Sequence, residues 1–429
     1  MMNDAELFSG IAVVVDDEVL DSNSSIGQIC AAITSSGSHV IPLAIPPTSE
    51  QIKTLSGVSF FIVDWNLDEN TRELGLEGVA VPATVTRESI RKTVNLLKDL
   101  KEQRVAPIFV FTNGDVEAVK QLIERDVPEG GHLLVKSKSD VIREGVNEVL
   151  TGWVKTSAAA YVLRHWELEY ERSKQSFFRD FYTKTVEWPV ILWTSFDKDG
   201  LPASDELGRL ISRNIQSRMT PFDFDLTPFV KANQAAIADK EVVLSVLEGE
   251  RYILSAALHG NSISPGDVFK EKGSYFLNIR PECDCVARGD EQSDAIELYL
   301  LRGSKLSKTQ HQTAENPKYG KIDEKDTEGI VYPIDGSKSV AFQFNGIEIR
   351  TWGSIKTKRI GRILPPYLTR FQERFAAYLQ RPGLSRYPGV VFTQISGNKN
   401  EPQVSAGLTD ERRKSSPDQK KPPQVAEKL

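Results

Sequence analysis

The residues that could do chemistry are polar side chains that directly follow short apolar runs in the first 150 residues of this 429-residue chain. They are Asp16, Asp17, Asp64, Thr112 and Lys136. Three carboxylates brought together repel one another, and a hard divalent cation such as Mg²⁺, which prefers oxygen ligands, relieves that repulsion. With Mg²⁺ bound, Asp64 is a carboxylate nucleophile for phosphorus. Thr112 and Lys136 would then contact the phosphoryl oxygens.

The elements that must position these residues are strands buried on both faces of a sheet. Continuous apolar runs such as Phe60-Phe61-Ile62-Val63 are typical of such strands. Strand patterns at 11–15, 40–45, 60–63, 107–111 and 133–135 alternate with helical patterns at 24–34, 89–100, 116–123 and 139–150, the last capped by Ser139. This alternation predicts an α/β domain over 1–150 with a doubly wound, five-stranded parallel sheet. The carboxyl ends of its strands would meet in one crevice, where such folds bind ligands.

This set of polar residues, each at the end of an expected strand, resembles the receiver domain of bacterial two-component response regulators. The acidic pair Asp16-Asp17, followed by Glu18, comes after the first strand, and Asp64 ends the third. Thr112 ends the fourth strand and Lys136 the fifth. The resemblance covers about residues 8–155 and implies a 2-1-3-4-5 strand order.

The resemblance also implies roles for these residues. Asp64 would accept a phosphoryl group from the phosphohistidine of a histidine kinase or a phosphotransfer protein. Thr112 would follow that group and Lys136 would pair with it. Mg²⁺ would be held by Asp16, Asp17, Asp64 and the backbone carbonyl of Asn66. The domain is thus predicted to be a phosphoacceptor in a phosphorelay, rather than an enzyme that turns over.

Three positions depart from the family pattern. Asn113 stands where a small residue is usual after the threonine, Ser137 replaces the usual proline after the lysine, and Leu133 replaces a frequent aromatic residue. The way in which phosphorylation of Asp64 would change the rest of the protein therefore cannot be inferred from the family. A degenerate receiver that only docks a partner is the alternative interpretation.

A helical linker is predicted over 151–186, because the pattern from Val141 to about Tyr182 contains no proline and continues the last helix of the first domain. Such a helix could transmit a structural change from the first domain to the second half of the chain. It could instead form the interface of a homodimer, or pack within one chain. A small helical subdomain is predicted over 187–248. It is followed by a β-rich, barrel-like domain over 249–352, in which Asn345-Gly346 between alternating runs predicts a two-residue hairpin.

The C-terminal part ends in a basic helix region over 353–390 and a polar tail over 391–429 that is predicted to be disordered. The basic residues would bind phosphates of nucleic acid or an acidic partner, or form a solvated face that balances an acidic chain. They are Lys356, Lys358, Arg359, Arg362, Arg370 and Arg374.

Other groups in the second half offer weaker chemistry. Cys283 and Cys285 could bind a metal with His259 or Asp284, but a single Cys-x-Cys lacks the second pair of a zinc site. Asp267 and Asp284 are candidate acids or bases. These residues sustain the alternative of an effector enzyme, a nuclease or hydrolase, regulated by the first domain.

Bulk properties narrow the remaining classes. The net charge of −6 gives no expectation of nucleic-acid binding, and no apolar run approaches the roughly 18 residues that a membrane span needs. A DNA-binding regulator stays open through the basic stretch, although no helix-turn-helix pattern is recognisable. The N-terminus lacks the shape of a secretory signal. Only three cysteines occur, which predicts a reducing compartment, the bacterial cytoplasm.

Overall fold

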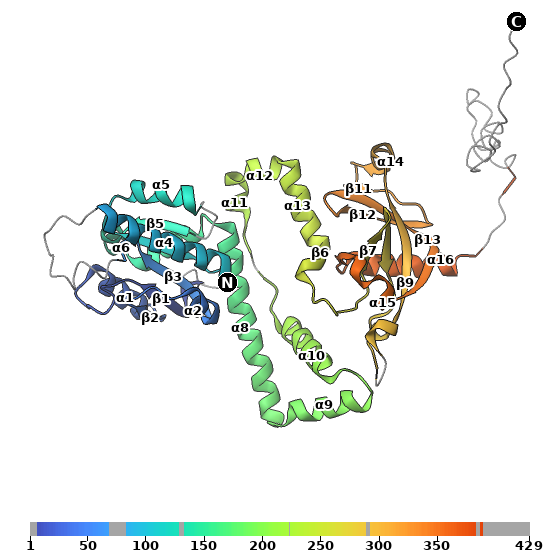
Figure 1. The fold of residues 1–429 in the computed structure, drawn as a ribbon, viewed down its shortest axis with the longest axis horizontal. Coiled ribbons are helices and arrows are strands. Elements are labelled where there is room, and N and C mark those ends of the chain that lie inside the picture. The colour runs from blue at the N-terminus through green and yellow to red at the C-terminus, as the bar shows by residue number, and fades with distance from the viewer. Residues whose placement is uncertain are drawn as a thin grey trace, which may run out of the picture.

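The computed structural model describes residues 7–67, 83–127, 133–222, 224–288, 292–382 and 387–388. The predicted disordered tail over 391–429 lies outside these residues. Within them, the chain forms a parallel sheet with helices at one end, a long helix in the middle and a curled antiparallel sheet at the other end (Figure 1). No helix of the described residues is long and apolar enough to cross a membrane.

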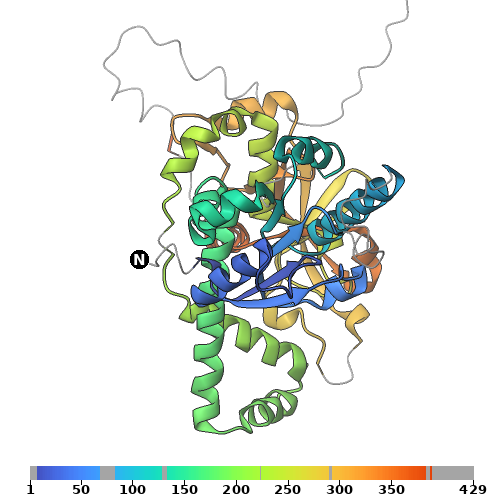
Figure 2. The ribbon, with the colours of Figure 1, turned by 90° about the vertical axis from the view of Figure 1, so that its left-hand side faces the viewer.

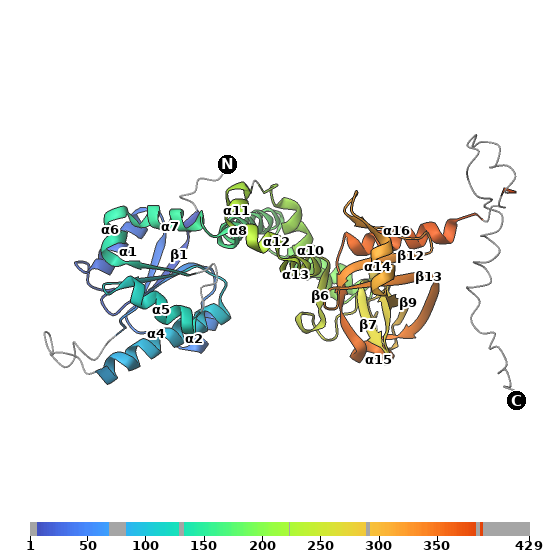
Figure 3. The same cartoon turned by 90° about the horizontal axis from the view of Figure 1, so that it is seen from above.

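The N-terminal sheet has five parallel strands in the order β2-β1-β3-β4-β5, which confirms the predicted order. The strands are β1 Ile11–Val15, β2 His39–Leu43, β3 Val58–Asp64, β4 Ile108–Thr112 and β5 Leu133–Ser137. Helices cover both faces, as Figure 3 shows, with α1, α6 and α7 on one face and α2, α4 and α5 on the other. They are α1 Ser25–Ser35, α2 Ser49–Thr54, α4 Ala83–Gln103, α5 Val116–Asp126, α6 Lys138–Glu144 and α7 Val146–Val154.

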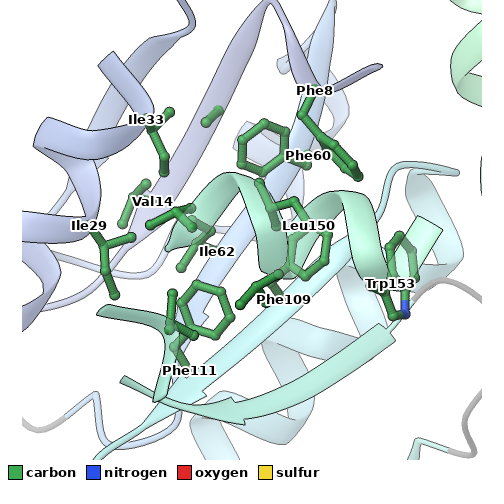
Figure 4. Packing of buried hydrophobic residues seen from close by; sticks show 14 of the residues in the cluster. Phe8, Val14, Ile29, Ile33, Phe60, Ile62, Phe109, Phe111, Leu150 and Trp153 are labelled. Atoms are coloured by element: carbon green, nitrogen blue, oxygen red, sulfur yellow. The ribbon is translucent and has the colours of Figure 1, made fainter. Parts of the chain in front are cut away.

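The central strands are buried on both faces, as their apolar runs predicted. Successive side chains of a strand point to opposite faces. Phe60 and Ile62 therefore pack under α1 and α7, whereas Phe61 and Val63 pack under α4 and α5. Phe60 meets Phe109 edge to face, with ring centroids 5.9 Å apart, in the cluster shown in Figure 4. This packing holds the strands in register, and with them the residues at their carboxyl ends.

The single helix predicted over 139–150 is two helices. Ser137, not Ser139, caps α6, because its hydroxyl accepts a hydrogen bond from the Asp140 amide over 3.1 Å. Gly145 then separates α6 from α7 with a φ of +93°, a backbone conformation that favours glycine. The expected continuation into the long helix is also wrong, because a turn at 155–157 ends α7 before Ser157 caps α8 (Ala158–Lys184).

Helix α8 is fastened to the first domain by a buried arginine. Arg164 Nε donates to the carbonyl of Leu7 over 2.7 Å, and its Nη2 donates to the carbonyl of Ser9 over 3.2 Å. The far end of α8 packs against α9 (Trp188–Lys198) and α10 (Ala203–Arg218), away from the sheet (Figure 2). The rest of the helical region is α11 Thr227–Ala232, α12 Gln234–Ala238 and α13 Lys240–Arg251.

The C-terminal part is a curled, seven-stranded antiparallel sheet in the order β12-β13-β9-β8-β7-β14-β6. Its strands are β6 Tyr252–Leu254, β7 Asp267–Glu271, β8 Ser274–Asn278, β9 Glu297–Lys305, β12 Glu328–Ile334, β13 Lys338–Thr351 and β14 Arg359–Ile363. Helix α16 (Tyr367–Gln380) packs on the sheet through Leu368 and Phe371. The smaller elements are α14 Lys308–Ala314, α15 Trp352–Ile355 and a separate ribbon of β10 Glu315–Asn316 and β11 Lys321–Ile322.

The hairpin predicted at Asn345-Gly346 is wrong. Strand β13 runs through this dipeptide and pairs with β9 on both sides of it. Phe342 lies opposite Gly303 and Ile347 opposite Leu301, so the residues between them form a bulge rather than a turn. An Asn-Gly pair suits either feature, and the long partner strand β9 favours the bulge because pairing continues beyond it.

Candidate functional site

Three carboxylates meet at the carboxyl edge of the N-terminal sheet. Asp16 and Asp17 follow β1, and Asp64 ends β3, the strand hydrogen-bonded beside it. One oxygen from each lies within 4.8 Å of the others. Among the described residues this is the group of acidic, His and Cys side chains placed to hold a metal ion. The structure thus brings together the three acidic residues that the sequence singled out.

A lysine that the sequence reasoning missed lies among these carboxylates. Lys138 Nζ donates to Asp16 Oδ2 over 2.7 Å and lies 3.2 Å from Asp64 Oδ1. The side chains of all three residues are nearly inaccessible, with exposed fractions of 2% for Lys138, 0% for Asp16 and 8% for Asp64. Lys136, the lysine that the sequence singled out, instead pairs through its ammonium with Glu144 at the end of α6.

The strand-to-helix junction explains which lysine enters the site. Strand β5 ends at Ser137, whose side chain caps α6, so Lys138 is the first residue of that helix. The sequence contained one signal for this boundary. Ser137, between the two lysines and three residues before Asp140, is a residue type that often caps a helix.

Burial dominates the electrostatics of Asp64. Loss of solvent raises the pKa of its carboxyl group to about 6, Lys138 opposes this rise, and the Asp16 and Asp17 carboxylates add to it. Burial by itself lowers the pKa of Lys138, but the Asp64 and Asp16 carboxylates outweigh it and leave that pKa raised. The site therefore holds three carboxylates close together, two of them in contact with the Lys138 ammonium.

Thr112 and Asn113 lie at the end of the neighbouring strand β4. Phe111, one residue earlier, pairs in register with Asp64. Thr112 is fully buried, and its Oγ1 accepts a hydrogen bond from the Gly114 amide over 3.0 Å. The Asn113 side chain is exposed. Thr112 thus lies at the end of β4, as expected, and its hydroxyl oxygen is hydrogen-bonded in the turn that follows the strand.

The segment after Asp64 is held by α4. The Thr93 hydroxyl donates to the carbonyl of Trp65 over 3.0 Å, and the Ser89 hydroxyl donates to the carbonyl of Leu67 over 3.3 Å. Asn66, the residue expected to offer a backbone carbonyl to a metal, is exposed between these two anchored residues. The two hydroxyl groups were not foreseen from the sequence, and they anchor the residues on either side of Asn66.

A cavity of about 360 Å³ opens next to the acidic cluster. Asp17 and Leu67 line it on the side of the sheet, Thr48 lines it on the side of α2, and Lys92 and Asp99 line it on the side of α4. Asp17 is only partly buried, unlike Asp16. Asp17 is thus the member of the acidic cluster that lines this cavity.

The candidate groups of the second half lie elsewhere and are bound within the chain. Asp267 is fully buried at the start of β7, where Arg362 Nε donates to its Oδ1 over 2.8 Å and the Ser264 amide donates to its Oδ2 over 3.0 Å. Arg359 lies 3.7 Å from the same carboxylate. Two arginines and a backbone amide fix Asp267 as the centre of a structural ion-pair cluster, a poor position for a general base.

The two cysteines of the Cys-x-Cys pair face different surroundings. Cys283 is exposed, whereas Cys285 is buried and accepts a hydrogen bond from Asn278 Nδ2 over 3.6 Å. Burial raises the pKa of the Cys285 thiol to about 11. His259 contributes its backbone carbonyl to Arg359. Within the described part of the chain, these side chains do not form a group placed to hold a metal ion.

The basic stretch does not form a continuous cationic surface in the described part of the chain. Lys356 pairs with Asp294, and Arg359 and Arg362 with Asp267. Arg370 and Arg374 both pair with the buried carboxylate of Glu324. Five of the six basic residues therefore share three carboxylates inside the C-terminal part.

Comparisons with known proteins add little to this geometry. No protein-family model and no curated protein matches the chain. Among solved structures, a trimeric coiled coil of yeast Spc42 fused to another structure is similar, with 14% sequence identity and a TM-score of 0.23. The match covers 41% of this chain and 95% of that chain. A similarity this low carries no argument about the site.

Proposed function

We propose that this protein is a phosphorylation-controlled signalling protein, a response regulator whose receiver domain accepts a phosphoryl group on Asp64. The observation that carries the proposal is the group of Asp16, Asp17 and Asp64 around the buried Lys138 at the carboxyl edge of a parallel sheet. The strand order β2-β1-β3-β4-β5 supports it as well. The phosphodonor would be a histidine kinase or a phosphotransfer protein.

The donor set suits Mg²⁺. One oxygen from each of three carboxylates lies within 4.8 Å of the others, and oxygens are the ligands that Mg²⁺ prefers. Asp16, Asp17, Asp64 and the carbonyl of Asn66 would hold the ion. Bound there, Mg²⁺ would screen the carboxylates and withdraw charge from phosphoryl oxygens.

Asp64 would act as the nucleophile, since its carboxylate is held at the end of strand β3 within the acidic cluster. Lys138 would orient Asp64 before transfer and pair with the phosphoryl oxygens afterwards. The Thr112 Oγ1 accepts a hydrogen bond from the Gly114 amide, and its own O–H would remain available to donate to a phosphoryl oxygen.

The link to the second half would start at Lys138. This residue opens α6, which leads through α7 to α8. Any shift of the Lys138 ammonium from Asp16 toward a phosphoryl group pulls on the first turn of α6. Because Arg164 fastens α8 to the backbone just before β1, α8 would follow movements of the first domain. A two-state change in this helix series would carry the signal.

The test is labelling of the full chain by a small phosphodonor such as acetyl phosphate, read by mass spectrometry. We expect a phosphoryl adduct that requires Mg²⁺ and is absent in Asp64→Asn. Lys138→Met should reduce labelling strongly, whereas the matched variant Lys136→Met should label as the wild type does. No adduct from several donors, or an adduct unaffected by Asp64→Asn, would refute the proposal.

We also propose a homodimer through the long helix, in the reducing environment of the cytoplasm. Trp166 and Tyr170 stack on α8 with ring centroids 5.1 Å apart and remain 45% and 37% exposed. Val190 and Ile191 on α9 are 65% and 60% exposed. Exposed apolar groups of this size favour a protein partner. Analytical ultracentrifugation should give a dimer that Trp166→Glu dissociates, and a monomeric wild type would exclude it.

A further inference from the structure

A second cavity lies in the C-terminal part, far along the chain from the acidic cluster. Its volume is about 670 Å³, within the range of small-molecule sites. Four segments enclose it: the end of α13, the β10–β11 ribbon, strand β12 and the first turns of α16 (Figure 1). No sequence motif pointed to this position, because its walls come from residues 247 to 371.

The walls of this cavity are apolar and aromatic. Ile330 and Val331 of β12 and Phe371 of α16 form buried parts of the lining. Tyr332 and Tyr367 add two rings that are only partly buried. Flat rings of this kind stack favourably on planar ligands.

Positive charge dominates the polar groups of the cavity. Arg251, Lys321 and Arg370 line it against a single carboxylate, Glu315, so the lining charge is three minus one, or +2. Each of the three cations also pairs with a carboxylate outside the lining: Glu250 for Arg251, Asp323 for Lys321 and Glu324 for Arg370. The excess of positive charge is therefore confined to the residues that line the cavity.

Arg251 is the most informative of these cations. Its guanidinium lies over the Tyr367 ring, 4.9 Å from the ring centroid, and Nη1 donates to the carbonyl of Tyr332. Its Nε is buried and makes no hydrogen bond to any described residue, with Glu250 Oε2 3.7 Å away. An unsatisfied buried guanidinium nitrogen is costly, and an anionic ligand would satisfy it.

We propose that this cavity binds a small organic anion with a planar ring, of the chemical class of a nucleoside monophosphate. The base would stack between the tyrosine rings and the apolar floor, and the phosphate would pair with Arg251, Arg370 and Lys321. The C-terminal part would then respond to a ligand, independently of the acidic site in the first domain.

The experiment is isothermal titration calorimetry of the full chain, without Mg²⁺, against AMP, GMP, CMP and UMP and against the corresponding nucleosides. We expect one-to-one binding of at least one monophosphate with a Kd below about 100 µM, and binding of its nucleoside at least about tenfold weaker. Arg370→Gln should weaken the monophosphate at least about tenfold.

Arg374→Gln is the matched control. Arg374 stands one turn further along α16 and pairs with the same Glu324, but it does not line the cavity. Its loss should change the Kd by less than about twofold. Thermal unfolding of each variant checks that it is folded. Absence of binding by all four monophosphates, equal binding of the nucleoside, or equal effects of Arg370→Gln and Arg374→Gln would overturn the proposal.

Discussion

Replacing Lys138 by methionine tests which lysine belongs to the acidic site. Methionine keeps the length and most of the volume of the side chain but removes its charge. Asp16 loses a hydrogen bond of 2.7 Å and Asp64 loses an ion pair at 3.2 Å, in a place where at most 8% of any of these side chains is exposed. Two carboxylates then remain buried together without a cation.

The expected magnitude follows from that burial. Removing one partner of a buried ion pair costs about 3–5 kcal/mol, because the remaining charge stays desolvated and unpaired. The matched change, Lys136→Met, breaks a pair with Glu144 whose side chains are 26% and 43% exposed. A pair this accessible is screened by solvent and contributes about 0–1 kcal/mol. The two neighbouring lysines should therefore differ by several kcal/mol.

Urea unfolding in EDTA at pH 8 measures both free energies. Mg²⁺ should restore much of the stability of Lys138→Met, because the ion replaces the lost positive charge, and should leave the Lys136→Met difference unchanged. Lowering the pH to 5 should also reduce the Lys138→Met defect, since protonation removes charge from the carboxylates. Equal losses in the two variants, or a larger loss for Lys136→Met, would refute the assignment of Lys138 to the site.

Three further predictions concern Asp64, Arg164 and the cysteines. Because the pKa of Asp64 is raised to about 6, the metal-free wild type should lose about 3 kcal/mol of stability as pH rises from about 3 to 7, and Asp64→Asn should escape this loss. Identical pH profiles of the two proteins in urea unfolding would contradict this prediction. Arg164→Met should destabilise the chain by about 3 kcal/mol in the same assay, since two backbone carbonyls lose charged donors, and a loss under about 1 kcal/mol would contradict that role. A thiol reagent at pH 8 should label Cys283 first, because burial raises the pKa of Cys30 and Cys285 to about 11; fast labelling that persists in Cys283→Ser would exclude this order.

The hairpin predicted at Asn345-Gly346 shows one limit of local sequence reasoning. The dipeptide suits a tight turn and a bulge equally well, because both need a residue pair that tolerates unusual backbone angles. The choice depended on strand β9, a partner long enough to pair with β13 on both sides of the dipeptide. Pairing over such a distance in sequence leaves no local signal.

The sequence by itself determined the parallel sheet and the position of its acidic residues. Long apolar runs can be buried only between two layers of helices, and polar residues that end such runs must lie at the sheet edge, so Asp16, Asp17 and Asp64 had to converge. The tertiary structure alone decided that Lys138 rather than Lys136 joins them. The two residues have the same side chain and flank one serine, and the direction of each depends on where β5 ends and α6 begins. That boundary is set by the hydroxyl cap of Ser137 and by the packing of α6 on α1.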